Sequence, residues 1–174
     1  MYYFTDCPSP VGTLTLASDG ECLLGLWIKG QKYFGSGLLK EAEKKEDLSI
    51  FHKTQEWLEE YFAGKKPQIS RIPLSPQGSG FRRQVWEILC EIPYGKVITY
   101  GEIAKKMAEK MGRPSMSSQA VGGAVGHNPV SIIIPCHRVV GANGSLTGYA
   151  GGLSVKKKLL QLEGVDMSRL FLPS

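Results

Sequence analysis

Three consecutive residues with reactive or charged side chains, Cys136, His137 and Arg138, lie inside an apolar stretch of the chain. Ile132–Ile134 precede them and Val139–Val140 follow them. A cysteine thiolate is a soft nucleophile, and a neighbouring imidazole is a base that works near neutral pH. Because burying histidine and arginine without partners is costly, their position favours a functional site. The alternative is an inert cysteine beside an incidental histidine, since free cysteine is often buried.

The apolar residues on both sides of this triplet predict buried strand. Pro135 has no N–H to donate, so strand pairing should break there. The thiol of Cys136 is therefore expected at a bend with packed chain on either side, which is the rigid support that a nucleophile needs.

Composition is that of an ordinary globular protein. Of the 174 residues, 42% are hydrophobic and 21% are charged. No apolar run approaches the roughly 20 residues of a membrane helix, and the N-terminus lacks the pattern of a signal peptide. We therefore expect a cytoplasmic protein without membrane contact.

The net charge of +5 is unevenly distributed along the chain. Residues 1–80 contain nine Lys and Arg against ten Asp and Glu, whereas residues 81–174 contain twelve against six. The excess positive charge lies in the half that contains Cys136, which suits a polyanion such as nucleic acid. A solvated basic surface explains the charge equally well.

The four cysteines are far apart, and none has the spacing of a zinc site. Cys90 lies in an apolar pattern typical of a core, and Cys7 and Cys22 carry no signal. We expect reduced thiols, no metal and no cofactor.

Hydrophobic periodicity and turn signals predict a protein of the α/β (α+β) class with two domains, residues 1–78 and 79–174. In the first, residues 13–17 and 22–28 predict a hairpin around Asp19-Gly20, and residues 48–62 predict an amphipathic helix that ends near Gly64. Turn formers at 73–80 mark the boundary. The first domain is therefore expected to be a small sheet with a helix.

The second domain is predicted to be mainly helical. Helices are expected at 81–89, 101–111 and 117–125, with a short extended piece at 97–100 and a last helix capped by Ser154 that runs through Glu163. Gly112-Arg113-Pro114 separates the second helix from the third. Two helices joined by a short turn with a glycine outline a helix-turn-helix.

The third of these helices contains the pair Gly122-Gly123. Each glycine costs a helix about 1 kcal/mol relative to alanine, which suggests that a large group approaches the backbone closely. Another element of the fold would explain this, and so would a nucleic-acid backbone. The helix has no long basic side chains, and its small residues suit a shallow or narrow groove.

A glycine-rich loop with one aromatic residue, Tyr149, occupies residues 141–152, directly after the Cys136 stretch. Such a loop is either a plain connection with no binding role or the wall of a pocket for a flat ring.

Together these motifs resemble the O6-alkylguanine-DNA alkyltransferases. The resemblance extends from about Phe81 to Gly164, whereas the N-terminal half resembles the small α/β domain of that family only loosely. The motifs that carry it are Pro135-Cys136-His137-Arg138-Val139, Gly126-His127-Asn128-Pro129 before it, and Tyr149-Ala150-Gly151-Gly152 after it.

The resemblance implies direct and irreversible DNA repair. A helix-turn-helix would bind double-stranded DNA through the minor groove, and an O6-alkylguanine would flip out of the stack into a pocket. Cys136 would then take and keep the alkyl group, so that each molecule, expected to be a monomer, reacts once. Which alkyl groups are preferred, and whether O4-alkylthymine is accepted, stays open.

By the same resemblance, five residues carry the reaction. Cys136 is the nucleophile, and His137 takes its proton through a water molecule while Glu163 orients the imidazole. Asn128 braces the turns of the site. Tyr100 helps to rotate the nucleotide and donates a hydrogen bond to the departing guanine. The alternatives are an ordinary helix-end glutamate for Glu163 and a half-buried core tyrosine for Tyr100.

Other residues are expected to bind the base and the duplex. The ring of Tyr149 lines the pocket, the backbone near Ala150 donates toward O6, and the carbonyls of Cys136 and Val139 accept from the guanine amino group. The expected pocket residues are Tyr149, Ala150, Val139 and Thr147. The expected DNA-binding residues are Ser118, Gln119, Ala120, Gly122, Gly123 and Arg138.

Gln119 departs from the family pattern, which usually has an arginine at this position that enters the duplex. Glutamine is shorter and uncharged, so we expect weaker DNA binding or less efficient base flipping. The segment 105–118 is also longer than is usual in the family.

Three other functions compete with this one. A damage sensor that flips the base without chemistry would replace the cysteine. A cysteine hydrolase with Cys136 and His137 would turn over repeatedly. A plain helix-turn-helix DNA binder with an incidental cysteine would gain no mass from damaged DNA.

Overall fold

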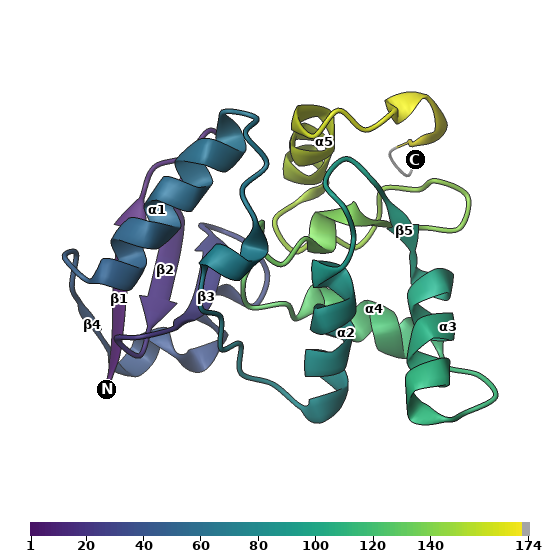
Figure 1. Ribbon diagram of the computed structural model, residues 1–174, viewed down its shortest axis with the longest axis horizontal. Coiled ribbons are helices and arrows are strands. Elements are labelled where there is room, and N and C mark those ends of the chain that lie inside the picture. Colours follow the sequence, from purple (N-terminus) through teal and green to yellow (C-terminus); the bar gives the residue numbers. More distant parts are fainter. Residues whose placement is uncertain (172–174) are drawn as a thin grey trace. The chain divides into compact units, whose positions relative to one another are not determined.

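The computed structural model describes residues 1–171 and divides into two compact units (Figure 1). The first unit comprises Met1–Gln77 and Pro129–Ile133, and the second comprises Gly78–Asn128 and the chain from Ile134 onward. The five residues 129–133, which lead into the Cys136 stretch, therefore pack with the first unit, a feature that the sequence did not predict. None of the helices among the described residues has the length and hydrophobicity to span a membrane.

The first unit is a four-stranded sheet with a long helix. Strand β4 (Ala42–Lys44) runs parallel to β1 (Tyr2–Cys7), while β2 (Leu14–Ser18) is antiparallel to both β1 and β3 (Leu23–Ile28), which gives the order β3-β2-β1-β4. The predicted hairpin is confirmed by the pairing of β2 with β3. Short 3₁₀ turns lie at Phe34–Gly37, Leu39–Glu41 and Ile69–Arg71.

Helix α1 (Ser49–Phe62) lies across this sheet (Figure 1). Its buried residues recur every three to four positions, which places them on one face of the helix. Gly64, with φ of +80°, follows the end of the helix, as predicted. The buried face consists of Ile50, Phe51, Thr54, Trp57, Leu58 and Tyr61.

Residues 129–133 extend the first unit beside β3. The N–H of Leu26 donates to the carbonyl of Pro129 (2.8 Å), and the N–H of Ser131 donates to the carbonyl of Leu26 (2.9 Å). The Ser131 hydroxyl also donates to the Gln31 side chain (3.1 Å). These bonds fix the chain just before the Cys136 stretch.

The strand predicted for Ile132–Ile134 does not form, although all three residues are buried. The N–H of Ile133 bonds back to the carbonyl of Ser131 (2.8 Å), and Ile132 between them has φ of +72°. This is the geometry of a γ-turn, a strained conformation for a β-branched residue. Tight turns replace the strand, because the N–H groups of Ile133 and Cys136 bond to carbonyls two residues back instead of to another strand.

The part of the second unit that the structure describes contains four α-helices and one small parallel pair of strands. In chain order these are α2 (Gly80–Cys90), β5 (Ile98–Thr99), α3 (Tyr100–Met111), α4 (Ser118–Gly126), β6 (Val139–Val140) and α5 (Leu153–Leu162). Strand β5 pairs with β6, which confirms the strand predicted after Cys136.

Side chains cap three of these helices, of which only the cap of α4 by Ser117 was predicted. Ser79, Thr99 and Ser117 each accept a hydrogen bond from the backbone N–H three residues further on, at the starts of α2, α3 and α4. The predicted cap at Ser154 is wrong. Helix α5 begins at Leu153 after Gly152 (φ +97°), so Ser154 lies inside its first turn.

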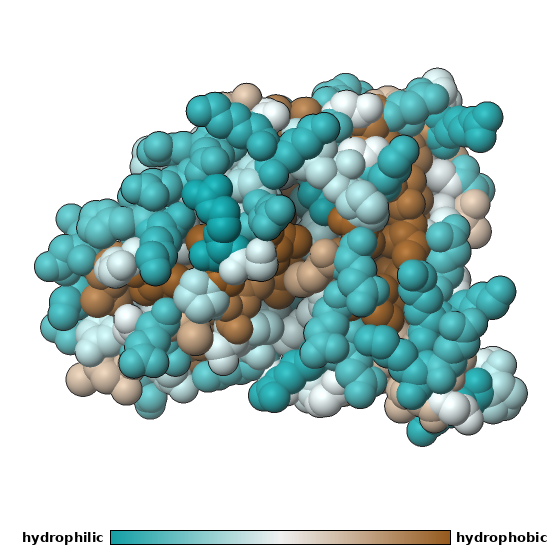
Figure 2. Space-filling model, in the orientation of Figure 1, coloured by the Kyte–Doolittle hydropathy of each residue, from teal (hydrophilic) through white to brown (hydrophobic). Residues whose placement is uncertain are grey.

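Helices α3 and α4 pack against each other and against α2, which gives the helix-turn-helix its support. The buried Trp86 indole N–H of α2 donates to the carbonyl of Ala124 in α4 (2.8 Å). Figure 2 shows mostly hydrophilic side chains with an apolar strip between α2 and α3. A pocket of about 200 Å³ there is lined by Ile88, Val97 and Ile98 among others, and none of its lining residues belongs to the predicted site.

We predict that Trp86→Phe lowers the free energy of unfolding by about 1–3 kcal/mol, because it leaves the buried Ala124 carbonyl without this donor. Amide hydrogen exchange in α4 should also accelerate. Trp57→Phe is the matched control, since its indole donates to the carbonyl of Gln68 (2.8 Å) in the first unit. For each variant, urea unfolding measures the free energy of unfolding and hydrogen exchange measures the protection of α4. Equal protection of α4 in the two variants would contradict this role.

Candidate active site

The Cys136 thiol begins a short 3₁₀ turn, Cys136–Arg138, that is reached through a tight bend. The N–H of Cys136 donates to the carbonyl of Ile134 (2.8 Å), and Pro135 between them has φ of −81° and ψ of 65°. This is an inverse γ-turn, and the proline ring already sets the required φ. The bend predicted at Pro135 is confirmed, and the thiol side chain is 5% exposed.

Asn128 braces this bend from the end of α4. Its side-chain amide donates to the Ile134 carbonyl (2.9 Å), and its side chain also hydrogen-bonds the Cys136 thiol. Both contacts are buried. The structure therefore places Asn128 where the resemblance put it, between the end of the helix-turn-helix and the nucleophile.

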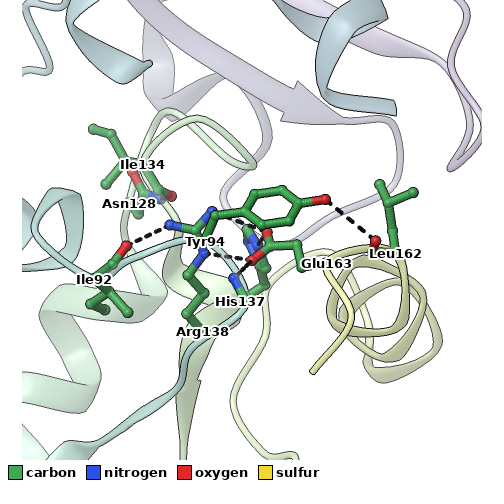
Figure 3. Close-up of polar contacts among 9 residues, drawn as sticks. Ile92, Tyr94, Asn128, Ile134, His137, Arg138, Leu162 and Glu163 are labelled. Carbon is green, nitrogen blue, oxygen red and sulfur yellow. Dashed lines mark hydrogen bonds and ion pairs between the residues drawn. The ribbon is translucent and has the colours of Figure 1, made fainter. Parts of the chain in front are cut away.

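His137 and Arg138 both point to the carboxylate of Glu163, at the end of α5 (Figure 3). His137 Nε2 lies 2.6 Å from Oε2, Arg138 Nη2 lies 3.1 Å from Oε2, and Arg138 Nε lies 2.8 Å from Oε1. The N–H of Gly95 also donates to Oε1 (3.0 Å). All three side chains are buried, so Glu163 is no ordinary helix-end glutamate.

The donor Gly95 belongs to a turn that sequence reasoning treated only as a helix stop. The N–H of Lys96 bonds to the carbonyl of Pro93 (3.1 Å), and Gly95 has φ of +80°, as the third position of a type II turn requires. Tyr94 in this turn places its ring 5.8 Å from the Arg138 guanidinium carbon. The turn signal was visible in the sequence, but its contact with Glu163 was not.

Arg138 corrects one of our expectations. It was predicted to bind DNA, but it is only 6% exposed, and its guanidinium is engaged by Glu163 and by the Ile92 carbonyl (2.7 Å). Its position in the sequence gave no sign that a buried carboxylate stands opposite. Arg138 is a positioning residue that holds Glu163.

The protonation states of this cluster follow from burial and charge. Burial alone would raise the pKa of Glu163, but the hydrogen bonds and charges of His137 and Arg138 outweigh it and lower that pKa to about 2. Burial lowers the pKa of His137 and, together with the smaller effects of the Arg138 and Lys156 cations, outweighs the hydrogen bond and the charge of Glu163, which raise that pKa. At neutral pH, Glu163 is therefore ionised and His137 is neutral.

These states select one tautomer of His137. An ionised carboxylate only accepts hydrogen bonds, so the proton of the neutral imidazole lies on Nε2, which faces Glu163. The lone pair then lies on Nδ1, which makes this nitrogen the basic one. Carboxylate, oriented imidazole and thiol are the components of a proton relay.

A buried lysine, Lys156 of α5, is a site residue that sequence reasoning missed. Its ammonium donates to the carbonyls of Val139 (2.5 Å) and Thr147 (2.8 Å), and within residues 1–171 it pairs with no carboxylate. Burial lowers its pKa to about 8, and the negative charge of a Cys136 thiolate opposes that shift. The helical periodicity of α5 could have found it, because Lys156 shares the inner face with Leu159 and Leu160.

The thiol itself is held mainly in its protonated form. Burial raises the pKa of Cys136, while the hydrogen bond from Asn128 and the charge of Lys156 lower it. The free thiol therefore needs a base to become a nucleophile, and Lys156 favours the charge that forms.

Tyr100 and the glycine-rich loop lie next to each other. The Tyr100 hydroxyl donates to the carbonyl of Thr147 (3.0 Å), the same oxygen that accepts from Lys156. Burial, and then the charge at Cys136, raise the pKa of Tyr100 to about 12. Gly148 leaves room for this hydroxyl, since a Cβ there would lie 2.6 Å from it.

Tyr149 is buried, and its hydroxyl has no hydrogen-bond partner among the described residues. Burial and the charge at Cys136 raise its pKa well above the usual value. Of the other expected pocket residues, Ala150 is half-buried and Val139 is fully buried. The Val139 carbonyl already accepts from Lys156 and retains one lone pair.

The expected DNA-binding residues of α4 lie on its open face. Ser118, Gln119, Ala120 and Gly123 are exposed, and Gly122 is half-buried. A Cβ on Gly122 would make only ordinary contact with the Tyr100 ring at 4.0 Å, and one on Gly123 would meet nothing within 4 Å. Packing among the described residues therefore does not require this glycine pair.

No group of three or more His, Cys, Asp and Glu side chains within residues 1–171 is arranged to hold a metal ion. Zinc analysis of the purified protein remains the test of the expectation that no metal is bound.

Comparisons with known proteins agree over most of the chain. Residues 80–165 match the family described as 6-O-methylguanine DNA methyltransferase, DNA binding domain, and residues 1–76 match its ribonuclease-like domain. A methylated-DNA–protein-cysteine methyltransferase of Haemophilus influenzae is 43% identical over 94% of this chain and 87% of its own. The protein of the same name in Methanosarcina acetivorans is 44% identical over 93% of this chain and 98% of its own.

A solved structure gives the same result in three dimensions. The Mycobacterium tuberculosis protein OGT, crystallised in complex with DNA, is 38% identical and superimposes with a TM-score of 0.79 over 97% of this chain and 94% of its own. The N-terminal half, which resembled the family only loosely by motif, is thus part of the match.

We predict that Lys156→Met shifts the pH dependence of Cys136 alkylation by iodoacetamide to higher pH by roughly one unit, because a nearby cation favours the thiolate. Lys157→Met is the matched control, since Lys157 is adjacent and exposed. Mass spectrometry of the Cys136 peptide across a pH series measures the rate. An equal shift in both variants, or none in either, would show that Lys156 does not stabilise the thiolate.

Proposed function

The chain belongs to the 6-O-methylguanine DNA methyltransferase family, and we propose that it repairs DNA by moving an alkyl group from O6 of guanine to the sulfur of Cys136. The Cys136 sulfur forms a bond to the alkyl carbon while the bond from that carbon to O6 breaks. The thioether that results is stable, so each molecule reacts once. One observation carries the proposal: a buried thiol follows an Asn-braced turn, beside a histidine that burial keeps neutral and an ionised glutamate orients.

Proton transfer would begin the reaction. We propose that the Cys136 proton passes through a water molecule to Nδ1 of His137, whose Nε2–H stays on Glu163. The imidazolium that forms is stabilised by this carboxylate, and the thiolate by Lys156 and Asn128. Lys156, which pairs only with carbonyls among the described residues, thereby gains an anionic partner in the same step.

The departing guanine carries the negative charge that the sulfur gives up. We propose that the Tyr100 hydroxyl, which burial keeps protonated, turns from the Thr147 carbonyl to donate its hydrogen bond to the departing guanine. For the base to reach it, the nucleotide must leave the stack, which costs a few kcal/mol and less at a weakened pair. We propose that Tyr149, Ala150, Val139 and Thr147 line the pocket that receives it.

Double-stranded DNA is the proposed partner, bound through the open face of α4. Gly122 and Gly123 weaken this helix without a packing reason among the described residues, which supports close approach of an external backbone. Small exposed residues suit the minor groove. We assign DNA binding and alkyl transfer to residues 79–174 and propose a cytoplasmic monomer that uses no cofactor.

The competing functions differ from this one in their products. A hydrolase would release product and react again, whereas alkyl transfer to Cys136 ends after one equivalent. A DNA binder or a damage sensor would leave the protein mass unchanged.

The direct test is intact-protein mass spectrometry after incubation with duplex DNA that contains O6-methylguanine. We predict a gain of a single methyl group that maps to Cys136. Cys136→Ala should gain nothing, and Cys90→Ala should react like the parent, because burial raises the pKa of the Cys90 thiol to about 11 and keeps it inert. Tight binding to the damaged duplex without any gain in mass would instead support a damage sensor.

Gln119 provides a second prediction. We expect Gln119→Arg to bind duplex DNA more tightly and to transfer the methyl group faster. The positive charge added within the duplex should also steepen the slope of log Kd against log salt by about one. Gln161→Arg, on the exposed surface of α5, is the control. Binding titrations at several salt concentrations, with single-turnover rates, measure the effect. No gain in affinity or rate would show that glutamine is not limiting.

A further inference from the structure

The loop that carries Thr147 and Tyr149 is bonded to the C-terminal segment, Val165–Phe171. The N–H of Leu146 donates to the carbonyl of Phe171 (2.9 Å), and the N–H of Phe171 donates to the carbonyl of Gly144 (3.1 Å). These two bonds make a parallel bridge between Ser145 and Phe171. The C-terminal segment thus adds a short strand to the loop just before Thr147.

Gly144 is required for this contact. Its φ of +92° is a conformation that side chains rarely adopt, and a Cβ at this position would lie only 2.1 Å from the carbonyl oxygen of Arg169. That oxygen belongs to the backbone and has little freedom to move. The backbones of the loop and of the C-terminal segment therefore approach each other as closely as glycine allows.

Apolar side chains hold the same contact together. A buried cluster from β6, the loop and α5 packs against partly buried side chains of the C-terminal segment. Its members are Val140, Leu146 and Leu160 on one side and Val165, Met167 and Leu170 on the other.

The contact lies one residue from the reaction site. Leu146 bonds to Phe171, and the next residue, Thr147, uses its carbonyl to hold both the Tyr100 hydroxyl and the Lys156 ammonium. A shift of the loop would move this carbonyl and with it two groups placed at the reacting atoms. Misplacement of about 1 Å costs a catalyst roughly a hundredfold in rate.

We propose that the C-terminal segment positions the substrate loop for alkyl transfer, with Gly144 and Leu170 as the positioning residues. This inference rests on the proposed function, because it concerns the rate of that reaction. Neither residue touches the thiol cluster of Cys136, His137 and Glu163 in the contacts described above. The reaction with DNA should therefore depend on the segment, while the intrinsic reactivity of the thiol should not.

The test compares Gly144→Ala and Leu170→Asp with the parent protein. The first forces the backbones apart, and the second puts a charge into the apolar cluster. Ala142→Ser and Arg169→Lys are the controls, because both side chains are exposed on the same loop and segment. Single-turnover methyl transfer from O6-methylguanine duplex is measured against DNA concentration. Hydrogen exchange of the Leu146 and Phe171 amides reports the contact, and iodoacetamide reports the thiol.

We expect both variants to lose protection at these two amides and about tenfold in the saturating transfer rate. Half-saturating DNA concentration and the pH profile of thiol alkylation should match those of the parent. A parent-like rate after loss of protection overturns the proposal, as does protection that survives in both variants. Equal losses in transfer and in thiol alkylation would place the effect at the nucleophile and overturn it too. Absence of transfer by the parent would refute the proposed function instead.

Discussion

The Glu163 carboxylate is the interaction on which the rest of the site depends. Each of its oxygens accepts two hydrogen bonds: Oε1 from Gly95 and Arg138, and Oε2 from Arg138 and His137. A buried carboxylate is stable only when its charge is compensated in this way. Its four donors come from the turn after α2 and from the 3₁₀ turn at Cys136, so one side chain of α5 ties together the segments that form the site.

The charges around the site explain why the proton moves from Cys136 to His137. Burial keeps His137 neutral, and the Arg138 cation beside Glu163 acts in the same direction, so the imidazole is free to receive a proton. Lys156 lies buried against two carbonyls, and its natural counter-ion is the thiolate of Cys136. Moving the proton from sulfur to imidazole creates one anion and one cation, and each forms beside a group of opposite charge. The site is therefore organised for the charge-separated state that precedes alkyl transfer.

Local patterns in the sequence predicted much of the fold, but not the buried contacts. Periodicity and turn signals, with a capping serine for α4, gave α1, α2, α3 and α4 nearly to the residue, because those signals are local. The prediction of a strand at Ile132–Ile134 was wrong, because apolar composition predicts burial but does not distinguish a strand from consecutive tight turns. Lys156 was missed although its place on the inner face of α5 was visible, and Arg138 was misjudged because its carboxylate partner is distant in sequence. A charged residue is usually exposed, and only the fold shows what neutralises it.

The protonation of His137 tests this account most directly. Protein with ¹⁵N-labelled histidine reports the state of each ring nitrogen by NMR, and His137→Gln assigns the signals of this ring. We predict a neutral imidazole at pH 7 with its proton on Nε2 and a basic Nδ1. An imidazolium at pH 7, or a neutral ring with the proton on Nδ1, would contradict it, because neither form could take the proton of Cys136 at Nδ1.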